Sequence, residues 1–248
     1  MDALREAAGY LARSRRTVAL TGAGVSTESG LPDFRSEGGL WAGVDPMEVA
    51  SLTAFRRHPE VFYRFYRTRL AQLGEAQPNP AHFALAALEM YRLAAVITQN
   101  VDGLHQAAGS SRVIELHGNL REAACLSCGW KGPIAVIAEA LDRGVLPACP
   151  TCGSHLKPNV VLFEELLPAE AYQEAEHEAQ SAEVLLIVGS SLQVTPAAWL
   201  PEVARSHGAA VVIINDGPTA MDSLADVIVR SRAGNALPTL VAAVAGAG

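Results

Sequence analysis

Residues 17–35 read TVALTGAGVSTESGLPDFR, and this stretch decides the fold. It opens with an apolar run from Val18 to Leu20, which predicts a short buried strand. Gly22 and Gly24 follow, and a missing side chain there lets the backbone turn sharply and approach a ligand. The next polar residues are of types that begin helices, whose free N–H groups would face a phosphate: Ser26, Thr27 and Ser29.

The glycines alone leave two interpretations equally open. Thr27 stands at the third glycine position of the G-x-G-x-x-G pattern, so the turn binds a phosphate or simply joins a strand to a helix. The following residues are more informative, because Pro32 ends any helix. The loop beyond it carries an acid, an aromatic and a base: Asp33, Phe34 and Arg35.

Length, composition and charge narrow the class of protein. The chain has 248 residues, half of them hydrophobic, and a net charge of −7. This length suits one large domain or a domain with an inserted lobe. The negative charge argues against nucleic acid or an anionic membrane as partner. The longest apolar runs, 184–188 and 209–214, are too short to span a membrane, and the N-terminus lacks the apolar core of a signal peptide. We therefore expect a soluble, cytoplasmic protein.

Strands that alternate with helices predict a Rossmann-like α/β fold, a parallel sheet with helices on both faces. The expected strands are 17–21, 94–98, 113–116, 159–163, 183–188, 210–214 and 226–229; the expected helices are 2–15, 80–91, 168–180, 196–206 and 235–245. Two segments interrupt the alternation. Residues 46–73 are helix-like and rich in arginine and aromatics, and residues 121–158 carry the cysteines and little core. We expect a large domain from residues 1–31, 75–120 and 159–248, and a small lobe from residues 32–74 and 121–158.

All four cysteines lie in two C-x-x-C pairs, each followed by a glycine: Cys125, Cys128, Cys149 and Cys152. Four thiolates suit a tetrahedral Zn²⁺ with no open position, so we predict one structural zinc ion. The alternatives are four buried cysteines and a redox pair. His155 is a candidate substitute ligand, although a surface histidine is the simpler interpretation.

Polar blocks follow three further strands. Residues 98–105 read TQNVDGLH, in which Asn100 or Asp102 can cap a helix or bind a ligand. Residues 115–118 read ELHG, and ligands bind at the carboxyl ends of strands in such folds. His117 is therefore a candidate general base as well as a candidate structural residue. His105 is the second candidate base. Residues 189–197 read GSSLQVTPA and offer a second phosphate or ribose cradle.

These blocks, taken together and in order, resemble the motifs of the sirtuins, a family of NAD-dependent protein deacylases, in their bacterial form. The matching motifs are GAG-x-S-x-x-SG-[IL]-PDFR, TQN-x-DGLH, E-x-HG and G-[TS]-S-L-x-V-x-PA, and they span nearly the whole chain. The resemblance implies that Asn100 and Asp102 hold the nicotinamide end of NAD, that Gln99 lies on its ribose, and that His117 is the base. His117 and Asn100 are then the catalytic residues.

The resemblance also implies a set of cofactor-binding residues: Gly22, Ala23, Gly24, Ser26, Glu28, Asp33, Phe34, Arg35, Trp41, Gln99, Asn100, Val101, Asp102, Gly189, Ser190, Ser191, Asn215, Asp216, Gly217 and Ala233. NAD would be consumed. The acyl-lysine oxygen attacks the nicotinamide ribose, nicotinamide leaves, and His117 takes a proton from a ribose hydroxyl. The products are free lysine, nicotinamide and O-acyl-ADP-ribose.

Residues 157–165 resemble the strand that pairs with the acyl-lysine peptide or protein in this family, through Val160, Val161 and Phe163. The family usually has glycine after the phenylalanine, and this chain has Glu164. Tyr66 and Arg69 lie three apart on a predicted helix and so share a face. Y-x-x-R at this place resembles the desuccinylase and demalonylase subgroup, whereas most arginines of this helix are expected to be solvated.

Two other functions stay open at this stage. One is an NAD-dependent protein ADP-ribosyltransferase, and the other is a non-catalytic NAD sensor. An intact His117 and the peptide-pairing strand favour the deacylase, with deacetylation alongside the removal of acidic acyl groups.

Overall fold

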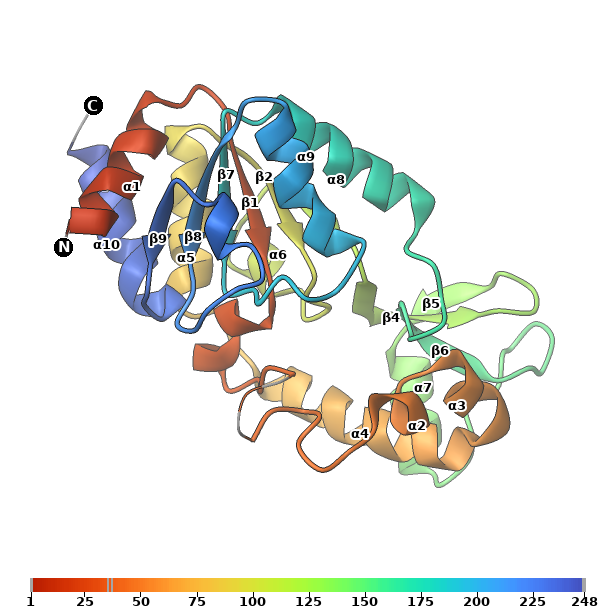
Figure 1. The fold of residues 1–248 in the computed structure, drawn as a ribbon. Coiled ribbons are helices and arrows are strands. Elements are labelled where there is room, and N and C mark those ends of the chain that lie inside the picture. The colour runs from red at the N-terminus through yellow and green to blue at the C-terminus, as the bar shows by residue number, and fades with distance from the viewer. Residues whose placement is uncertain (1, 35, 37, 247–248) are drawn as a thin grey trace.

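A computed structural model of the chain describes residues 2–34, 36 and 38–246. Six parallel strands form the main sheet in the order β3-β2-β1-β7-β8-β9 (Figure 1). Their bounds are β1 Thr17–Thr21, β2 Leu93–Thr98, β3 Val113–Glu115, β7 Val184–Val188, β8 Ala210–Ile214 and β9 Val227–Val229. The strand of the opening stretch, β1, lies between β2 and β7, so its glycine turn stands at the middle of the sheet edge. The Rossmann-like parallel sheet predicted from the sequence is confirmed.

Helices cover both faces of this sheet, as Figure 1 shows. On one face lie α1 (Asp2–Arg13), α5 (Pro80–Leu88) and α10 (Ala233–Ala245); on the other lie α8 (Ala169–Ser181) and α9 (Leu200–Ser206). Side chains alternate along the strand, so Ala19 packs in the first core while Val18 and Leu20 pack in the second. Burial on both faces explains why these strands are continuous apolar runs.

A second, antiparallel sheet lies beside the first, in the order β5-β4-β6. Its strands are β4 Gly118–Cys125, β5 Lys131–Pro133 and β6 Leu156–Val160. It packs with α7 (Ala135–Asp142) and with α2 (Pro46–Val49), α3 (Leu52–Arg57) and α4 (Pro59–Glu75), which gather at one end of the molecule (Figure 1). Short 3₁₀ turns complete the chain: η1 Ala23–Val25, η2 Thr27–Ser29, η3 Glu89–Tyr91, η4 Ala197–Trp199 and η5 Asp222–Leu224. The four-residue helix α6 spans Leu104–Ala107.

Three expectations from the sequence need correction. The helix-like segment 46–73 is three helices, because Ser51 caps α3 through the amide of Ala54 and Pro59 begins α4. The strand expected at 159–163 ends at Val160 and belongs to the second sheet, where it pairs antiparallel with β4. Residues 121–158 were expected to carry little core, yet Ile137, Leu156 and two cysteines form a small one.

Among the described residues, none of the helices combines the length and the apolar composition needed to cross a membrane.

Candidate active site

A cavity of about 1360 Å³ opens at the carboxyl ends of the parallel strands and runs on to the second sheet. Turns after all six parallel strands and after β6 line it, and this is where ligands bind in α/β sheets. Most of the residues assigned to NAD or substrate from the sequence line it: Gly22, Ala23, Gly24, Glu28, Asp33, Phe34, Trp41, Tyr66, Arg69, Gln99, Val101, His117, Val160, Val161, Phe163, Gly189, Ser190, Ser191, Asn215, Asp216, Gly217 and Ala233. Arg35 lies outside the described residues.

The two glycine turns touch each other at the floor of the cavity. The amide of Gly24 donates to the carbonyl of Gly189 at 2.8 Å, and a Cβ on Gly22 or Gly24 would lie 2.8 Å from that same oxygen. Glycine is therefore required here by the close approach of two backbones. The turns after β1 and β7 form one continuous backbone surface against which a nucleotide can lie.

Ser26, Asn100 and Asp102 are not among the described residues that line the cavity, because their side chains bond to one another behind it. Ser26 Oγ donates to Asp102 Oδ2 at 2.7 Å, and Asn100 Nδ2 donates to Ser26 Oγ and to the carbonyl of Gly22, both at 3.1 Å. The helix start expected at Ser26 is wrong, since two 3₁₀ turns stand there and Ser26 makes no cap bond. Asp102 Oδ1 accepts the amide of Leu104 at 2.9 Å, but the N-cap of α6 is Gly103 and has no side-chain cap bond, so the capping interpretation of Asp102 is not confirmed.

His82 completes this network and was missed by the sequence analysis. Its Nδ1 accepts the backbone N–H of Asn79 at 3.2 Å, so Nε2 carries the proton and donates to Ser26 Oγ at 3.3 Å. Burial lowers the pKa of His82, which keeps the ring neutral in this role. The available signal was its spacing, since Asn79 is a helix cap and His82 stands three residues later, where a capping box has its second member.

His117 lies at the seam between the two sheets. Its Nδ1 is 2.9 Å from the carbonyl oxygen of Gln99, which can only accept, so Nδ1 carries the proton and Nε2 keeps its lone pair. Burial lowers the pKa of His117, and the bond to Gln99 opposes this in part. The arrangement gives a neutral imidazole of fixed tautomer on the wall of the cavity.

His105 is poorly suited to act as a base. It is 1% exposed, does not line the cavity among the described residues, and contacts Thr21 Oγ1 through Nε2 at 3.0 Å. The hydroxyl proton of Thr21 is used on Thr98 Oγ1, so His105 Nε2 donates. Burial and the nearby His82 lower the pKa of His105 to about 3. His105 is a structural partner, which agrees with its second place in the sequence analysis.

Tyr66 and Arg69 of α4 are buried on the side of the cavity away from the glycine turns, with exposed fractions of 7% and 9%. Arg69 Nη1 donates to Gln72 Oε1 at 3.2 Å. Within the part of the chain that the structure describes, no carboxylate lies within ion-pair distance of Arg69. Burial raises the pKa of Tyr66 and lowers that of Arg69. Apolar side chains packed in the same region were not assigned to the site by the sequence analysis: Phe65, Leu120 and Leu162.

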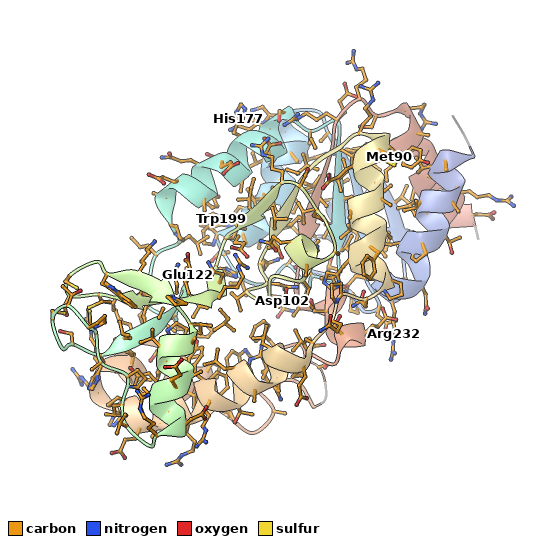
Figure 2. The ribbon with its side chains drawn as sticks, turned by 180° about the vertical axis from the view of Figure 1, so that it is seen from behind. Met90, Asp102, Glu122, His177, Trp199 and Arg232 are labelled. Atoms are coloured by element: carbon orange, nitrogen blue, oxygen red, sulfur yellow. The ribbon has the colours of Figure 1, made fainter. Side chains whose placement is uncertain are left out.

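Aromatic rings separate this apolar region from the glycine turns. The ring of Trp41 lies 5.4 Å from Phe34, 5.9 Å from Phe65 and 6.1 Å from Phe163. Asp102 lies between the main sheet and α4 (Figure 2). The cavity therefore has a polar part over the sheet edge and an apolar part beside α4, with Trp41 between them.

The far end of the polar part is closed by the start of α10. Glu28 Oε2 accepts the amide of Gly234 at 2.7 Å and so satisfies a helix start that has no cap of its own. Asn215 Nδ2 bonds to the carbonyl of Gly217 at 2.8 Å, which shapes the loop after β8.

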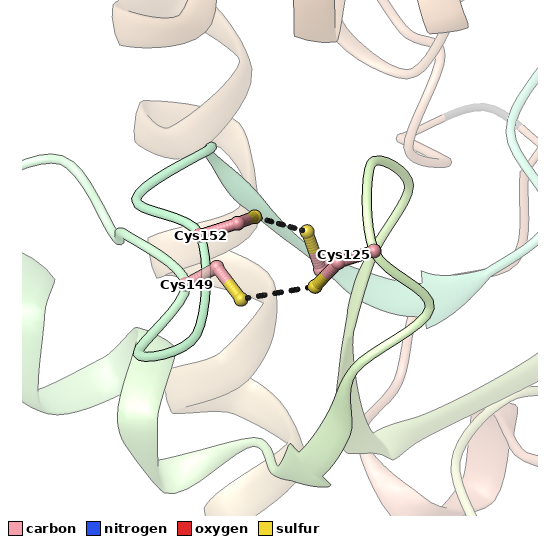
Figure 3. Close-up of side chains that lie close together, drawn as sticks. Cys125, Cys149 and Cys152 are labelled. Atoms are coloured by element: carbon pink, nitrogen blue, oxygen red, sulfur yellow. Dashed lines mark hydrogen bonds between the residues drawn. The ribbon is translucent and has the colours of Figure 1, made fainter.

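The four cysteines converge from two loops that face each other (Figure 3). All four sulfur atoms lie within 4.8 Å of one another, with Cys125 to Cys152 at 3.5 Å and Cys128 to Cys149 at 3.6 Å. Thiolates bound at about 2.3 Å to a tetrahedral zinc lie about 3.8 Å apart, so the set fits that ion. His155 is not part of this set among the described residues.

Removal of one buried ligand should test the structural role of zinc. We expect Cys149→Ala to lose stoichiometric zinc and to lower the midpoint of thermal unfolding by about 5–15 °C, because metal binding adds to folding free energy. Metal analysis and a thermal melt measure both. His155→Ala is the matched control and should keep one zinc per chain. A fully stable, zinc-free Cys149→Ala protein would contradict the prediction.

Comparison with known proteins gives one consistent result. The model of the Sir2 family matches residues 22–196. The NAD-dependent protein deacylase 2 of Archaeoglobus fulgidus is 47% identical over 242 residues, which cover 97% of this chain and 95% of that protein. A solved structure described as "Structural Basis for the Mechanism and Regulation of Sir2 Enzymes" is 46% identical, with a TM-score of 0.93, and the match covers 99% of this chain and 98% of that chain. A Sir2 structure with a deacetylated p53 peptide and 3′-O-acetyl ADP-ribose is 40% identical, with a TM-score of 0.92, and the match covers 96% and 97% of the two chains.

Proposed function

Because the chain belongs to the Sir2 family, it is an NAD-dependent protein deacylase, and we propose that His117 is its general base and that its acyl pocket is built for acyl groups that end in a carboxylate. The observation that supports the base is the bond from His117 Nδ1 to the carbonyl of Gln99, which leaves Nε2 able to accept a proton. The observation that supports the acyl preference is the buried guanidinium of Arg69 on the cavity wall, which has no carboxylate of the described residues within ion-pair distance.

In the overall reaction an acyl-lysine, NAD and water give free lysine, nicotinamide and O-acyl-ADP-ribose. We propose that NAD lies over the glycine turns, with its nicotinamide end toward Asn100 and Asp102. Their bonds to Ser26 hold both side chains in place. After nicotinamide leaves, a ribose hydroxyl must lose its proton in order to attack the acyl carbon. His117 Nε2 takes this proton, and the neutral ring imposed by burial suits that step.

The pH dependence of the reaction follows from the same burial. Since burial lowers the pKa of His117 from 6.5, more than half of the imidazole is neutral at pH 6.5, and the basic form is lost progressively at lower pH. We expect kcat/KM to fall on the acid side with a midpoint below 6.5 and to level off as the pH rises toward 8. A profile from pH 5 to pH 8 with a fixed acyl-lysine peptide measures this. An acid limb with its midpoint above 6.5 would contradict the assignment.

We propose that the acyl-lysine peptide adds to the free edge of β6. This strand is the edge of the antiparallel sheet, since β4 pairs with its other side. Extended peptides bind such edges through backbone hydrogen bonds. Val160, Val161 and Phe163 line the cavity beside the edge, so the lysine side chain can enter between them and Trp41.

The acyl group would then reach α4. A carboxylate in an apolar pocket needs a charged partner, and arginine offers a fork of donors that matches it. Arg69 lies in this part of the cavity. Its Nη1 donates to Gln72, an uncharged acceptor, and the Tyr66 hydroxyl can serve as a further donor to the acyl carboxylate. Succinyl and malonyl groups fit this chemistry. Incubation with NAD and a panel of acetyl, malonyl and succinyl peptides, read by mass spectrometry, tests both parts of the proposal.

Two further proposals concern organisation and location. We propose that residues 32–74 and 121–158 act as a small lobe against a large NAD-binding domain, since they pack in two cores distinct from those of the main sheet.

We also propose a cytoplasmic location, because cysteines paired for a metal suit a reducing compartment.

A further inference from the structure

The turn that follows β6 is bonded to the start of α3, more than one hundred residues earlier in the chain. Glu164 Oε2 accepts the backbone N–H of Thr53 at 2.7 Å, and Glu164 Oε1 accepts the Thr53 hydroxyl at 3.0 Å. One carboxylate therefore satisfies two donors of a single residue, and both bonds are charge-assisted.

Backbone bonds run beside this contact. Phe163 donates its amide to the carbonyl of Ala50 and accepts the amide of Leu52, both at 3.0 Å, so Ser51 and Phe163 form a parallel bridge. These bonds and the Glu164 carboxylate join residues 50–53 to residues 163–164. We call this joint, made of Ala50, Ser51, Leu52, Thr53, Phe163 and Glu164, the latch.

Glu164 has an unusual conformation for its residue type. Its φ angle is 74°, in the left-handed region that favours glycine. The side chain is exposed, so packing does not account for its presence. The hydrogen bonds of its carboxylate within the described residues go to Thr53 alone. The bond with Thr53 therefore accounts for a glutamate in this conformation.

The position of the latch gives this bond a consequence. Ala50, Phe163 and Glu164 line the cavity, and Phe163 lies three residues after the end of β6 at Val160. On the other side, α3 packs against α4, the helix that carries Tyr66 and Arg69. The latch thus joins the edge that would bind the peptide to the helix that would bind the acyl group.

We propose that Glu164 is a positioning residue for the substrate peptide: its carboxylate fixes the turn after β6 to α3 and so holds the binding edge in its bound shape before the peptide arrives. The inference rests on the proposed binding of an acyl-lysine peptide along β6. If the edge is ordered in only a fraction of the free molecules, the apparent affinity for the peptide is the intrinsic affinity multiplied by that fraction. A change at Glu164 should therefore affect the binding of the peptide and should not affect the chemical steps of the reaction with NAD.

The decisive variant is Glu164→Gly, because glycine accepts the φ angle while the carboxylate is removed with the rest of the side chain. We expect the KM for an acyl-lysine peptide to rise by about three- to thirtyfold, with kcat and the KM for NAD within twofold of the original protein. Amide hydrogen exchange in the free protein should accelerate at Thr53 and Phe163. Glu164→Gln keeps an oxygen for the Thr53 amide and should restore most of the peptide affinity. Thr53→Val removes only the hydroxyl bond and should give a smaller rise in KM.

Each outcome separates the latch from the proposed function. A wild-type protein that deacylates none of the peptides would overturn the proposed function, while the exchange rates at Thr53 and Phe163 would still report on the joint. In an active protein, an unchanged peptide KM or unchanged exchange in Glu164→Gly would overturn the latch. Equal changes in kcat and in both KM values would show a general loss of structure instead of positioning.

Discussion

His117→Ala should lower the rate of deacylation by about 10²–10⁴-fold, the usual contribution of a positioned general base. The ring acts after nicotinamide has left, so NAD affinity should stay within a few-fold of the original. Exchange of labelled nicotinamide into NAD, which precedes the proton transfer, should persist. Rates from mass spectrometry, NAD affinity from calorimetry and the exchange assay measure the three expectations.

A histidine elsewhere on the surface provides the control. His177 is an exposed residue of α8 (Figure 2) and is not among the described residues that line the cavity, so His177→Ala should leave the rate unchanged. Near-normal turnover in His117→Ala would remove this residue from the role of base. Loss of NAD binding together with activity would point to a structural role, for which the bond to the Gln99 carbonyl is the obvious candidate.

The main sheet was predictable because its strands are buried on both faces. Such strands must be continuous apolar runs, and the strand expected at 183–188 differs from β7, Val184–Val188, by one residue at its start. The order of the strands could not be predicted in the same way. The place of β1 between β2 and β7 depends on pairings across 77 residues, as from Val18 to Ala95, and 167 residues, as from Val18 to Leu185, and local patterns carry no information about such partners.

The candidate site was predictable where side chains follow strands directly. Gln99, His117 and Ser190 come after three different strands and all line one cavity, because the carboxyl ends of parallel strands meet at one edge. Whether each of these side chains lines the cavity or bonds behind it was not predictable. Asn100 turns inward to the carbonyl of Gly22 while its neighbour Gln99 reaches the cavity, and the sequence treats the two alike.

In the small lobe, the convergence of the cysteines was easier to predict than the ends of the helices. Cysteine spacing predicted the convergence of four sulfur atoms, since short turns bring each C-x-x-C pair together. The breaks within residues 46–73 were harder to predict, although Pro59 is a typical first residue of a helix. The pairing of residues 50–53 with the turn after β6 could not be predicted from local sequence patterns, because the two segments meet only in the folded chain.

Arg69→Met should separate acidic from neutral acyl substrates more sharply than any other change in the pocket. Methionine keeps the length and the apolar stem of the side chain and removes the charge. Leaving a buried carboxylate without its partner costs on the order of 2–5 kcal/mol. We therefore expect kcat/KM for a succinyl-lysine peptide to fall by about 30-fold to several thousand-fold, at about 1.4 kcal/mol per decade.

An acetyl-lysine peptide has no distal carboxylate, so its kcat/KM should change far less in the same variant. Arg67→Met is the matched control, because Arg67 lies two residues away on the same helix, is 63% exposed and faces Asp142. That variant should leave both substrates unaffected, since exposed ion pairs contribute little.

The comparison of two substrates in one variant decides between two roles for Arg69. A guanidinium that only supports α4, through Gln72 and the apolar packing of its stem, would lower activity on both peptides equally. A guanidinium that binds the distal carboxylate would lower only the activity on the acidic acyl group, because the lost interaction exists only with that substrate. Wild-type activity on acetyl-lysine far above that on succinyl-lysine would contradict the acyl preference, whatever Arg69→Met does. Arg69 would then be a buried charge whose partner is something other than the acyl group.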